Sequence, residues 1–207
     1  MSNNVVPLKK LETSNPYEEL KSAYQSEIEQ VDSFIKEKLS SHIELIGEMS
    51  SYLIQSGGKR LRPLLTIASS GLFGYQGDRH IKLAACVEPI HNATLLHDDV
   101  IDKSDFRRGK KTNNHLWGNK NSILTGDYLL GRCFEIMVED GSLEVLKLLS
   151  SVSSEIAQGE ILQLQHEKEV ETLEKTYLEI IGSKTSSLFA ASMRVGGCIN
   201  DKSKNEK

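Results

Sequence analysis

The stretch LLHDDVIDKSDFRRGKKTNN, residues 95–114, places four aspartates between positions 98 and 105 and four basic residues between 107 and 111. Blocks of like charge usually form a solvated face or a disordered segment. Here the first aspartates lie in the apolar run TLLHDDVID, where crowded carboxylates repel one another and lose hydration. Something cationic must therefore compensate for them.

A hard divalent cation is one solution. On a helix, residues four apart lie one turn above each other, so Asp98 and Asp102 share a face and Asp99 lies about a quarter turn around it. Mg²⁺ typically takes one or two carboxylates and completes its shell with water and phosphate oxygens. The alternative is an exposed acidic face paired with lysines, although the residue four positions after Asp98 is another aspartate.

Basic residues form three patches. Arg107 and Arg108 follow the aspartates, and arginine binds phosphate oxygens in a bidentate manner. The segment GGKRLRP places Lys59, Arg60 and Arg62 after two glycines that allow backbone amides to approach an anion. Lys184 lies in the apolar segment IIGSKTSSLFAAS, where a lysine also commonly extends its amine to the surface. Together, the carboxylates and cations suit two diphosphates, one held through metal and one held directly.

The rest of the chain predicts an all-α protein. Nothing alternates with period two over a useful length, whereas apolar residues recur at helical spacing. We predict a polar loop at residues 103–121 and one domain over 1–207, with a mobile arm at 1–14 and a polar tail at 201–207. The predicted helices cover residues 14–39, 42–56, 64–74, 78–102, 122–140, 142–169 and 172–199.

Composition excludes some classes of protein. The 29 acidic and 25 basic residues give a net charge of −4, which does not fit a general nucleic-acid surface. The three cysteines have no metal-ligand spacing, and a reduced, cytoplasmic location is the simplest interpretation. No stretch approaches the roughly 20 apolar residues of a transmembrane helix, so we expect at most a peripheral membrane contact for a lipid product.

The ordered set GGKRLRP, LLHDDVID, RRGKKTNNHLWGN, GDYLLGR, GEILQL and KTSSLFAAS resembles the trans-isoprenyl diphosphate synthases, or polyprenyl synthetases. The resemblance runs from about residue 20 to 200. It implies an isoprenoid-synthase-type antiparallel helical bundle, Mg²⁺ as cofactor and a homodimer.

The resemblance also implies roles for individual residues. Asp98 and Asp102, supported by Asp99, would bind the metal. The remaining assignments divide into three sets. The allylic diphosphate would contact Arg107, Lys184, Thr185 and Gln163; isopentenyl diphosphate would contact Lys59, Arg62, His91 and Arg108; and Ala93 and Thr94 would line the floor that sets chain length.

The implied reaction is Mg²⁺-dependent head-to-tail condensation of isopentenyl diphosphate with an allylic diphosphate such as farnesyl diphosphate. The cations draw charge from the departing diphosphate, and the double bond of isopentenyl diphosphate attacks the carbocation-like carbon. The resulting cation then loses a proton, which in this family the departing diphosphate is thought to take. Because Ala93 and Thr94 are small, we expect a long, octaprenyl-like product, suited to a quinone side chain.

The sequence departs from the family in one respect. The family's second aspartate-rich motif is absent from these 207 residues, so we expect a C-terminally incomplete bundle with half of the metal clamp. Three hypotheses follow: a truncated fragment that is inactive alone, a half-enzyme completed by a second polypeptide, or a non-catalytic subunit that binds diphosphate or a partner synthase. An unrelated helical phosphohydrolase or a terpene cyclase would not require GGKRLRP and tandem arginines.

Overall fold

The first described helix begins with the predicted cap. The computed structural model describes residues 15–200, so the predicted arm and tail lie outside the described residues. The Asn15 side chain accepts the backbone N–H of Tyr17, and Pro16 occupies the first helical position, where its missing N–H is not needed. The helix predicted over 14–39 is divided into α1 (Pro16–Ala23) and α2 (Gln25–Lys38), because Tyr24 leaves helical geometry at φ −118° and ψ 25°.

The other predicted helices are confirmed, with shifts at their ends. They are α3 (Glu44–Gln55), α4 (Leu61–Leu72), α5 (Arg79–Ile101), α7 (Asn119–Asp140), α8 (Leu143–His166), α9 (Glu174–Ile181) and α10 (Ser187–Cys198). A π-helical turn, η1 (Gly182–Ser186), joins α9 to α10. Helix α4 begins three residues before its predicted start, because Pro63 is tolerated in a first turn.

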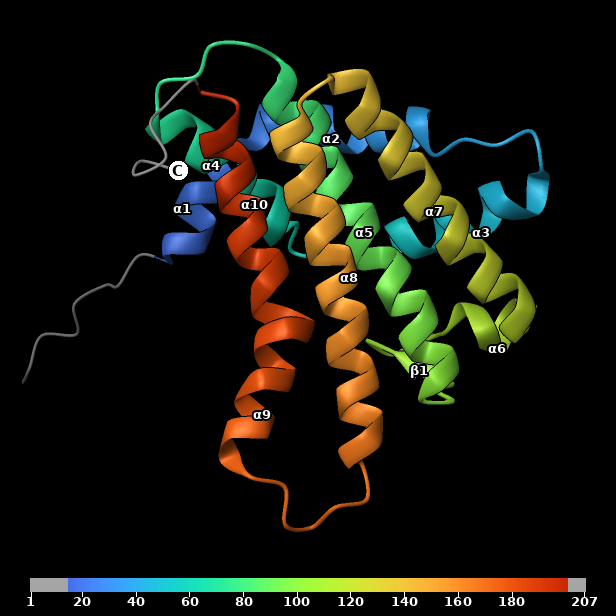
Figure 1. Ribbon diagram of the computed structural model, residues 1–207. Helices are drawn as coiled ribbons and strands as arrows, with labels where there is room; N and C mark the ends of the chain where they lie inside the picture. The colour runs from blue at the N-terminus through green and yellow to red at the C-terminus, as the bar shows by residue number, and fades with distance from the viewer. Residues whose placement is uncertain (1–14, 201–207) are drawn as a thin grey trace, which may run out of the picture.

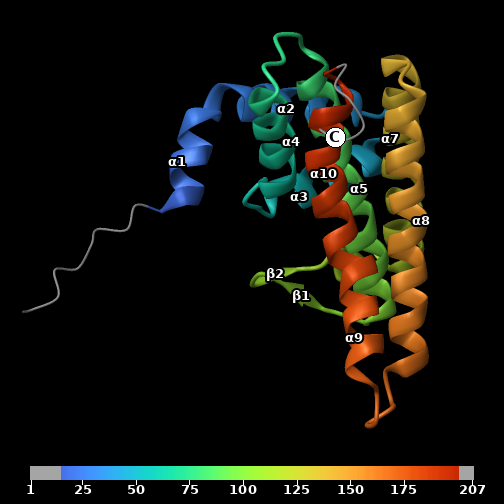
Figure 2. The same cartoon turned by 60° about the vertical axis from the view of Figure 1, so that its left-hand side comes forward.

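The predicted polar loop contains regular structure. Strands β1 (Phe106–Arg107) and β2 (Lys110–Lys111) form an antiparallel hairpin, followed by the short helix α6 (Asn113–Trp117). The hairpin turn has Arg108 at φ 52° and Gly109 at φ 77°, which is the left-handed backbone that a two-residue hairpin needs. Figure 2 shows this hairpin projecting from the end of α5.

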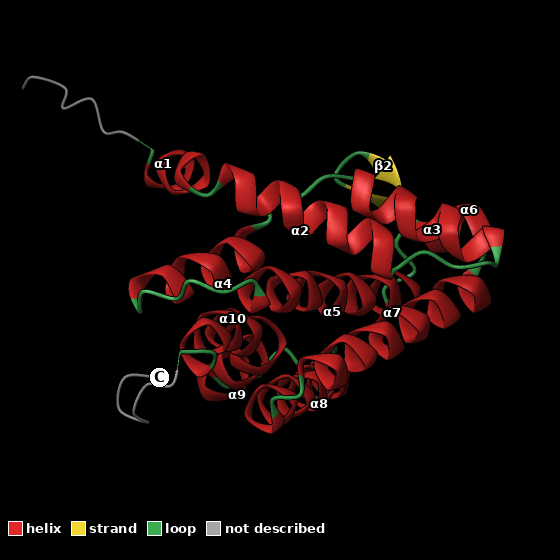
Figure 3. Ribbon diagram, turned by 90° about the horizontal axis from the view of Figure 1, so that it is seen from above, coloured by secondary structure: helices red, strands yellow, loops and turns green. Residues whose placement is uncertain are grey.

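Helix α5 occupies the middle of the molecule. Viewed from above, α4, α5 and α7 form a central layer, with α1, α2, α3 and α6 on one side and α8, α9 and α10 on the other (Figure 3). Helix α5 contacts α2, α4, α7 and α10, so it is apolar on most of its circumference, as expected for a surrounded helix. Figure 1 shows α8 running antiparallel to the α9–α10 segment.

The core consists of two apolar clusters on either side of α5. One joins α5 to α7, α8 and α10 and includes Val87, Leu149 and Val195; the other joins it to α2 and α4 and includes Ile35 and Leu64. The cysteines at 86 and 133 are buried and free. Within residues 15–200, no helix has the length and apolarity needed to cross a bilayer.

Helices α4 and α10 approach closely at Gly196. A Cβ atom there would lie 2.0 Å from Ser69 Oγ and 2.6 Å from the Ser70 backbone nitrogen. The Thr66 hydroxyl also donates to the Ser192 carbonyl at 2.9 Å across this contact. Glycine is therefore required sterically at position 196.

We expect Gly196→Ala to lower the free energy of unfolding by about 1–3 kcal/mol, because the added methyl group must separate α4 from α10. Gly47→Ala is the matched control, since a Cβ there meets nothing within 4 Å; it should gain up to about 1 kcal/mol from helix propensity. Urea denaturation of the two variants measures both effects. Equal stabilities would contradict the steric explanation.

Candidate functional site

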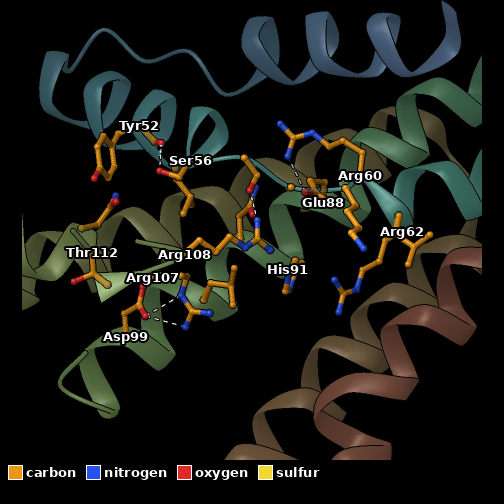
Figure 4. A pocket seen from close by; sticks show the side chains of 18 of the residues that line it. Tyr52, Ser56, Arg60, Arg62, Glu88, His91, Asp99, Arg107, Arg108 and Thr112 are labelled. Carbon is orange, nitrogen blue, oxygen red and sulfur yellow. Dashed lines mark hydrogen bonds and ion pairs between the residues drawn. The ribbon is translucent and has the colours of Figure 1, made fainter. Parts of the chain in front are cut away.

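A cavity of about 480 Å³ lies between the end of α3, the loop before α4, helix α5 and the hairpin (Figure 4). This volume falls within the range of small-molecule sites. Its charged lining residues are predominantly basic. They are the cations Lys59, Arg60, Arg62, Arg107, Arg108 and Lys111 and the carboxylates Glu88 and Asp99.

Two of the arginines are held by the two carboxylates. Arg60 Nη1 donates to Glu88 Oε1 at 2.8 Å, and Arg107 Nη2 donates to Asp99 Oδ1 at 2.8 Å. Glu88 and Asp99 are both buried in α5. The two charges within each pair cancel. The net positive charge of the cavity therefore lies on Lys59, Arg62, Arg108 and Lys111.

Arg62 and His91 lie side by side in this positive environment. The Arg62 guanidinium stacks on the Phe189 ring at 4.3 Å, and its buried Nε has no hydrogen-bond partner. Burial lowers the pKa of Arg62, with Glu88 opposing the effect. Burial, followed by the charges of Arg62, Arg108 and Arg107, lowers the pKa of His91 to about 3. His91 is therefore neutral at pH 7 and can hydrogen-bond to an anion without adding charge.

The hairpin places Arg108 opposite the glycine loop. Arg108 Nη1 donates to the Gly57 carbonyl. Lys59 is exposed, with its amine 5.6 Å from the centre of the Tyr17 ring and its carbonyl accepting the Tyr17 hydroxyl at 2.7 Å. Among residues 15–200, no carboxylate forms a salt bridge with Lys59, Arg62 or Arg108. The structure thus brings together all four residues predicted to bind isopentenyl diphosphate.

A second cluster lies between α5, α8 and the π-turn. Lys184 Nζ contacts Glu160 Oε2 at 2.5 Å, Gln163 Oε1 at 3.2 Å and Asp98 Oδ2 at 3.7 Å. Gly159 permits this approach, because a Cβ there would lie 2.9 Å from the Lys184 backbone nitrogen. Lys184 is thus a partner of buried carboxylates, and the alternative of an amine extended to the surface is wrong.

The charges in this second cluster influence one another. The pKa of Asp98 is raised to about 6, chiefly by burial. The charge of Lys184 opposes this rise, Glu160 and Asp102 contribute to it, and Arg107 opposes it. Burial works against the charge of Lys184, but its hydrogen bond to Glu160 and the nearby Asp98 carboxylate raise its pKa overall. The cluster carries more carboxylates than lysines, so an added cation would be stabilised there.

The three predicted metal ligands point to different surroundings. Asp98 faces Lys184, Asp102 is the exposed C-cap of α5, and Asp99 is turned toward Arg107 in the first cavity. Asp99 therefore does not face the same side as Asp98. Arg107, predicted to contact the allylic diphosphate, is committed to that ion pair.

The remaining predicted residues fall outside the cavity. Thr185 is exposed in the π-turn. Ala93 is completely buried in the core, and the Thr94 hydroxyl donates to the His91 carbonyl at 2.7 Å. Neither Ala93 nor Thr94 lines the cavity, so their influence on chain length stays a prediction.

Sequence reasoning missed two buried glutamates, and it placed Arg60 in a basic patch without predicting its ion pair. Glu160 pairs with Lys184, while Glu88 and Arg60 pair with each other. A signal was present in each case, because a glutamate in the apolar stretches GEILQL and ACVEPI must find a cationic partner if it is buried. The sequence does not say which cation that partner is, because the pairs span 24 and 28 positions.

The second cluster fits a hard divalent cation. Asp98 and Asp102 supply carboxylate oxygens, and the buried Glu160 Oε1 has no hydrogen-bond partner. Residues 15–200 hold no ready-made group of three or more His, Cys, Asp or Glu side chains that could bind a metal. Protein carboxylates would thus supply only part of the shell, as is usual for Mg²⁺ bound together with phosphate oxygens.

The all-α bundle is the fold of the isoprenoid synthases, as its solved structural neighbours show. The chain belongs to the polyprenyl synthetase family, whose model matches residues 43–207. The family resemblance drawn from the motifs is therefore confirmed.

Individual relatives agree with this assignment. The chain is 43% identical over 169 residues to the octaprenyl diphosphate synthase of Escherichia coli, a match covering 82% of this chain and 52% of that protein. It is similar to the crystal structure of a decaprenyl diphosphate synthase from Rhodobacter capsulatus, with a TM-score of 0.90, 46% identity and coverage of 92% and 59%.

A second solved structure contains ligands. It is a polyprenyl synthase from Caulobacter crescentus complexed with calcium and isoprenyl diphosphate, with a TM-score of 0.90, 41% identity and coverage of 92% and 58%. The chain spans about half the length of the curated relatives that it matches.

The partly buried, neutral His91 predicts acid sensitivity. Its pKa is about 3 in the folded protein and about 6.5 when unfolded, so below pH 6.5 the unfolded chain binds a proton that the folded chain does not. Stability should therefore fall by about 2 kcal/mol from this group between pH 7 and pH 5. Urea denaturation at both pH values should show a smaller loss for His91→Gln. Identical losses would contradict the assigned environment.

Proposed function

We propose that this chain binds isopentenyl diphosphate and an allylic diphosphate and catalyses their Mg²⁺-dependent head-to-tail condensation to a long-chain polyprenyl diphosphate. The observation that carries the proposal is the pair of charged clusters at the end of α5. One has cations without carboxylate partners, and the other has carboxylates arranged around Lys184. The calcium and isoprenyl diphosphate in the Caulobacter crescentus structure support this interpretation.

Isopentenyl diphosphate is assigned to the first cavity. Lys59, Arg62 and Arg108 provide charge for its phosphate oxygens, and neutral His91 provides a hydrogen bond. Direct recognition by arginine favours a bidentate geometry and therefore fixes orientation as well as affinity. The orientation matters because the double bond must face the reacting allylic carbon.

The allylic diphosphate is assigned to the second cluster. Asp98 and Asp102 would hold Mg²⁺, which would neutralise charge on the departing diphosphate. Lys184 lies 3.7 Å from Asp98 and donates to Gln163 at 3.2 Å, so we assign both residues to the leaving diphosphate. We also assign Thr185 of the π-turn and Arg107 of the hairpin to the allylic diphosphate, although Arg107 is paired with Asp99 in this structure. We assign Asp99 to holding Arg107.

The product is proposed to be long, because Ala93 and Thr94 offer no aromatic ring to block a growing chain. Relatives named octaprenyl and decaprenyl diphosphate synthases are consistent with this length.

The test is to incubate the purified chain with labelled isopentenyl diphosphate, farnesyl diphosphate and Mg²⁺ and to size the products. Polyprenyl products of about octaprenyl length are expected. Asp98→Asn should reduce the rate by at least about a hundredfold, because it removes charge at the departing group. Asp78→Asn, at an exposed ion pair with Lys82, should leave the rate unchanged.

Each negative result of this assay bears on a different part of the proposal. Diphosphate binding without product would favour a non-catalytic subunit or a half-enzyme that needs a second polypeptide. An absence of diphosphate binding would contradict the proposal altogether. Equal rates in Asp98→Asn and the control would remove the aspartates from the mechanism.

We also propose that two copies of the chain pair through α7. Exposed apolar side chains follow one face of this helix, and contiguous apolar surface commonly marks an interface. Leu124, Val138 and the neighbouring Leu143 are 64%, 65% and 80% exposed, with Phe134 between them. Figure 3 shows α7 and α8 lying together at the margin of the bundle.

Light scattering should give a mass twice the 23.1 kDa of one chain. Val138→Glu should shift the protein toward the monomer by placing a charge in the apolar contact. Val170→Glu is the control, because Val170 is fully exposed in the α8–α9 connection. A monomeric wild-type protein would contradict the pairing.

A further inference from the structure

We propose that Arg60 is a positioning residue for the isopentenyl diphosphate subsite, acting through Glu88 rather than by contacting the substrate. The inference rests on the proposed function, because it concerns the way in which Lys59 and Arg62 are held. Arg60 stands between these two residues in the sequence, yet its side chain is engaged quite differently from theirs (Figure 4).

The Arg60 guanidinium joins three helices. Its Nε donates to Asp32 on α2 at 2.9 Å, its Nη1 to Glu88 on α5 at 2.8 Å and its Nη2 to the Ile54 carbonyl on α3 at 3.2 Å. The side chain is only 13% exposed. The carboxylates of Asp32 and Glu88 both pair with the Arg60 guanidinium. They raise its pKa despite the opposing effect of burial. Arg60 consequently adds little to the cavity's attraction for an anion.

The backbone at Arg60 depends on these contacts. Its φ of 49° is in the left-handed region, which costs a non-glycine residue about 1–2 kcal/mol. Such a conformation persists where the surroundings determine it. Helix α4 begins at the next residue, so the turn at Arg60 sets the direction in which α4 carries Arg62.

The pair also lies beside the other cations of the subsite. A Cβ at Gly58 would meet Arg108 Nη1 at 3.4 Å, Arg60 Nη1 at 3.6 Å and Glu88 Oε1 at 3.7 Å. The Glu88 charge reaches Arg62 as well, where it opposes the effect of burial. Glu88 therefore offsets the positive charge of Arg60 and Arg62 in a region where the Arg108 guanidinium also lies.

Two substitutions distinguish positioning from direct binding. Arg60→Lys keeps a charge but loses the planar fork that reaches three partners. Glu88→Gln removes negative charge near the cavity. If Arg60 bound the diphosphate directly, releasing it from Glu88 should strengthen binding. If the Arg60–Glu88 pair positions the loop, both substitutions should weaken binding of isopentenyl diphosphate.

We expect each variant to weaken isopentenyl diphosphate binding by about tenfold or more in calorimetry, the usual cost of losing a residue that orients a ligand-binding group. Binding of farnesyl diphosphate with Mg²⁺ should change less than twofold. The double variant should lose less than the product of the two single losses, because both act through one pair. Amide hydrogen exchange in residues 57–61 should accelerate in each single variant.

Arg79→Lys and Asp140→Asn are the matched controls. Arg79 makes a two-point ion pair with the buried Asp140 at 2.8 and 2.9 Å, far along α5 from the subsite. These control substitutions should lower the melting temperature. They should not change the affinity for isopentenyl diphosphate or farnesyl diphosphate, or the amide hydrogen exchange of residues 57–61.

Several outcomes would overturn the inference. They are unchanged or tighter isopentenyl diphosphate binding in Glu88→Gln, equal losses for both ligands, or unaltered exchange in the loop of Arg60→Lys. A wild-type chain that binds neither diphosphate would instead refute the proposed function, and the positioning role would fail with it.

Discussion

The site depends on the burial of negative charge in α5. Glu88 and Asp99 are buried in a helix surrounded by apolar side chains, and a buried carboxylate must be paired or it destabilises the fold. Each is paired with an arginine from a different loop, Arg60 before α4 and Arg107 in the hairpin. Because the two buried carboxylates of α5 must be neutralised, they hold the loop before α4 and the hairpin in place against this helix.

Beside those loops lie cations that form no salt bridge with any carboxylate of residues 15–200. Arg62, Arg108 and Lys59 converge on one cavity, and their mutual repulsion is tolerated because the scaffold holding them is neutral. His91 remains uncharged in their field. The cavity is therefore prepared for an anion before one arrives, which lowers the cost of reorganisation on binding.

On the other side of α5 the charge pattern is reversed. Asp98 and Glu160 surround Lys184, and the carboxylates outnumber the amine. The two clusters are separated by the end of one helix. One presents unpaired basic side chains, and the other presents carboxylates in excess of its lysine. Adjacent positions 98 and 99 face opposite clusters because successive residues on a helix point about 100° apart.

The all-α class, most helices, the cationic segments and the family were readable from the sequence, because helical periodicity and motif order are local properties of the chain. The partners of the buried charges were not, since Arg60 and Glu88, or Lys184 and Glu160, are brought together only when distant helices pack. The break at Tyr24 and the hairpin at 106–111 also escaped prediction. Sequence alone thus determined which charged groups the chain contains and how they are spaced. Tertiary packing decided which of them are neutralised and which remain charged, because ion pairing depends on distance in space and not along the chain.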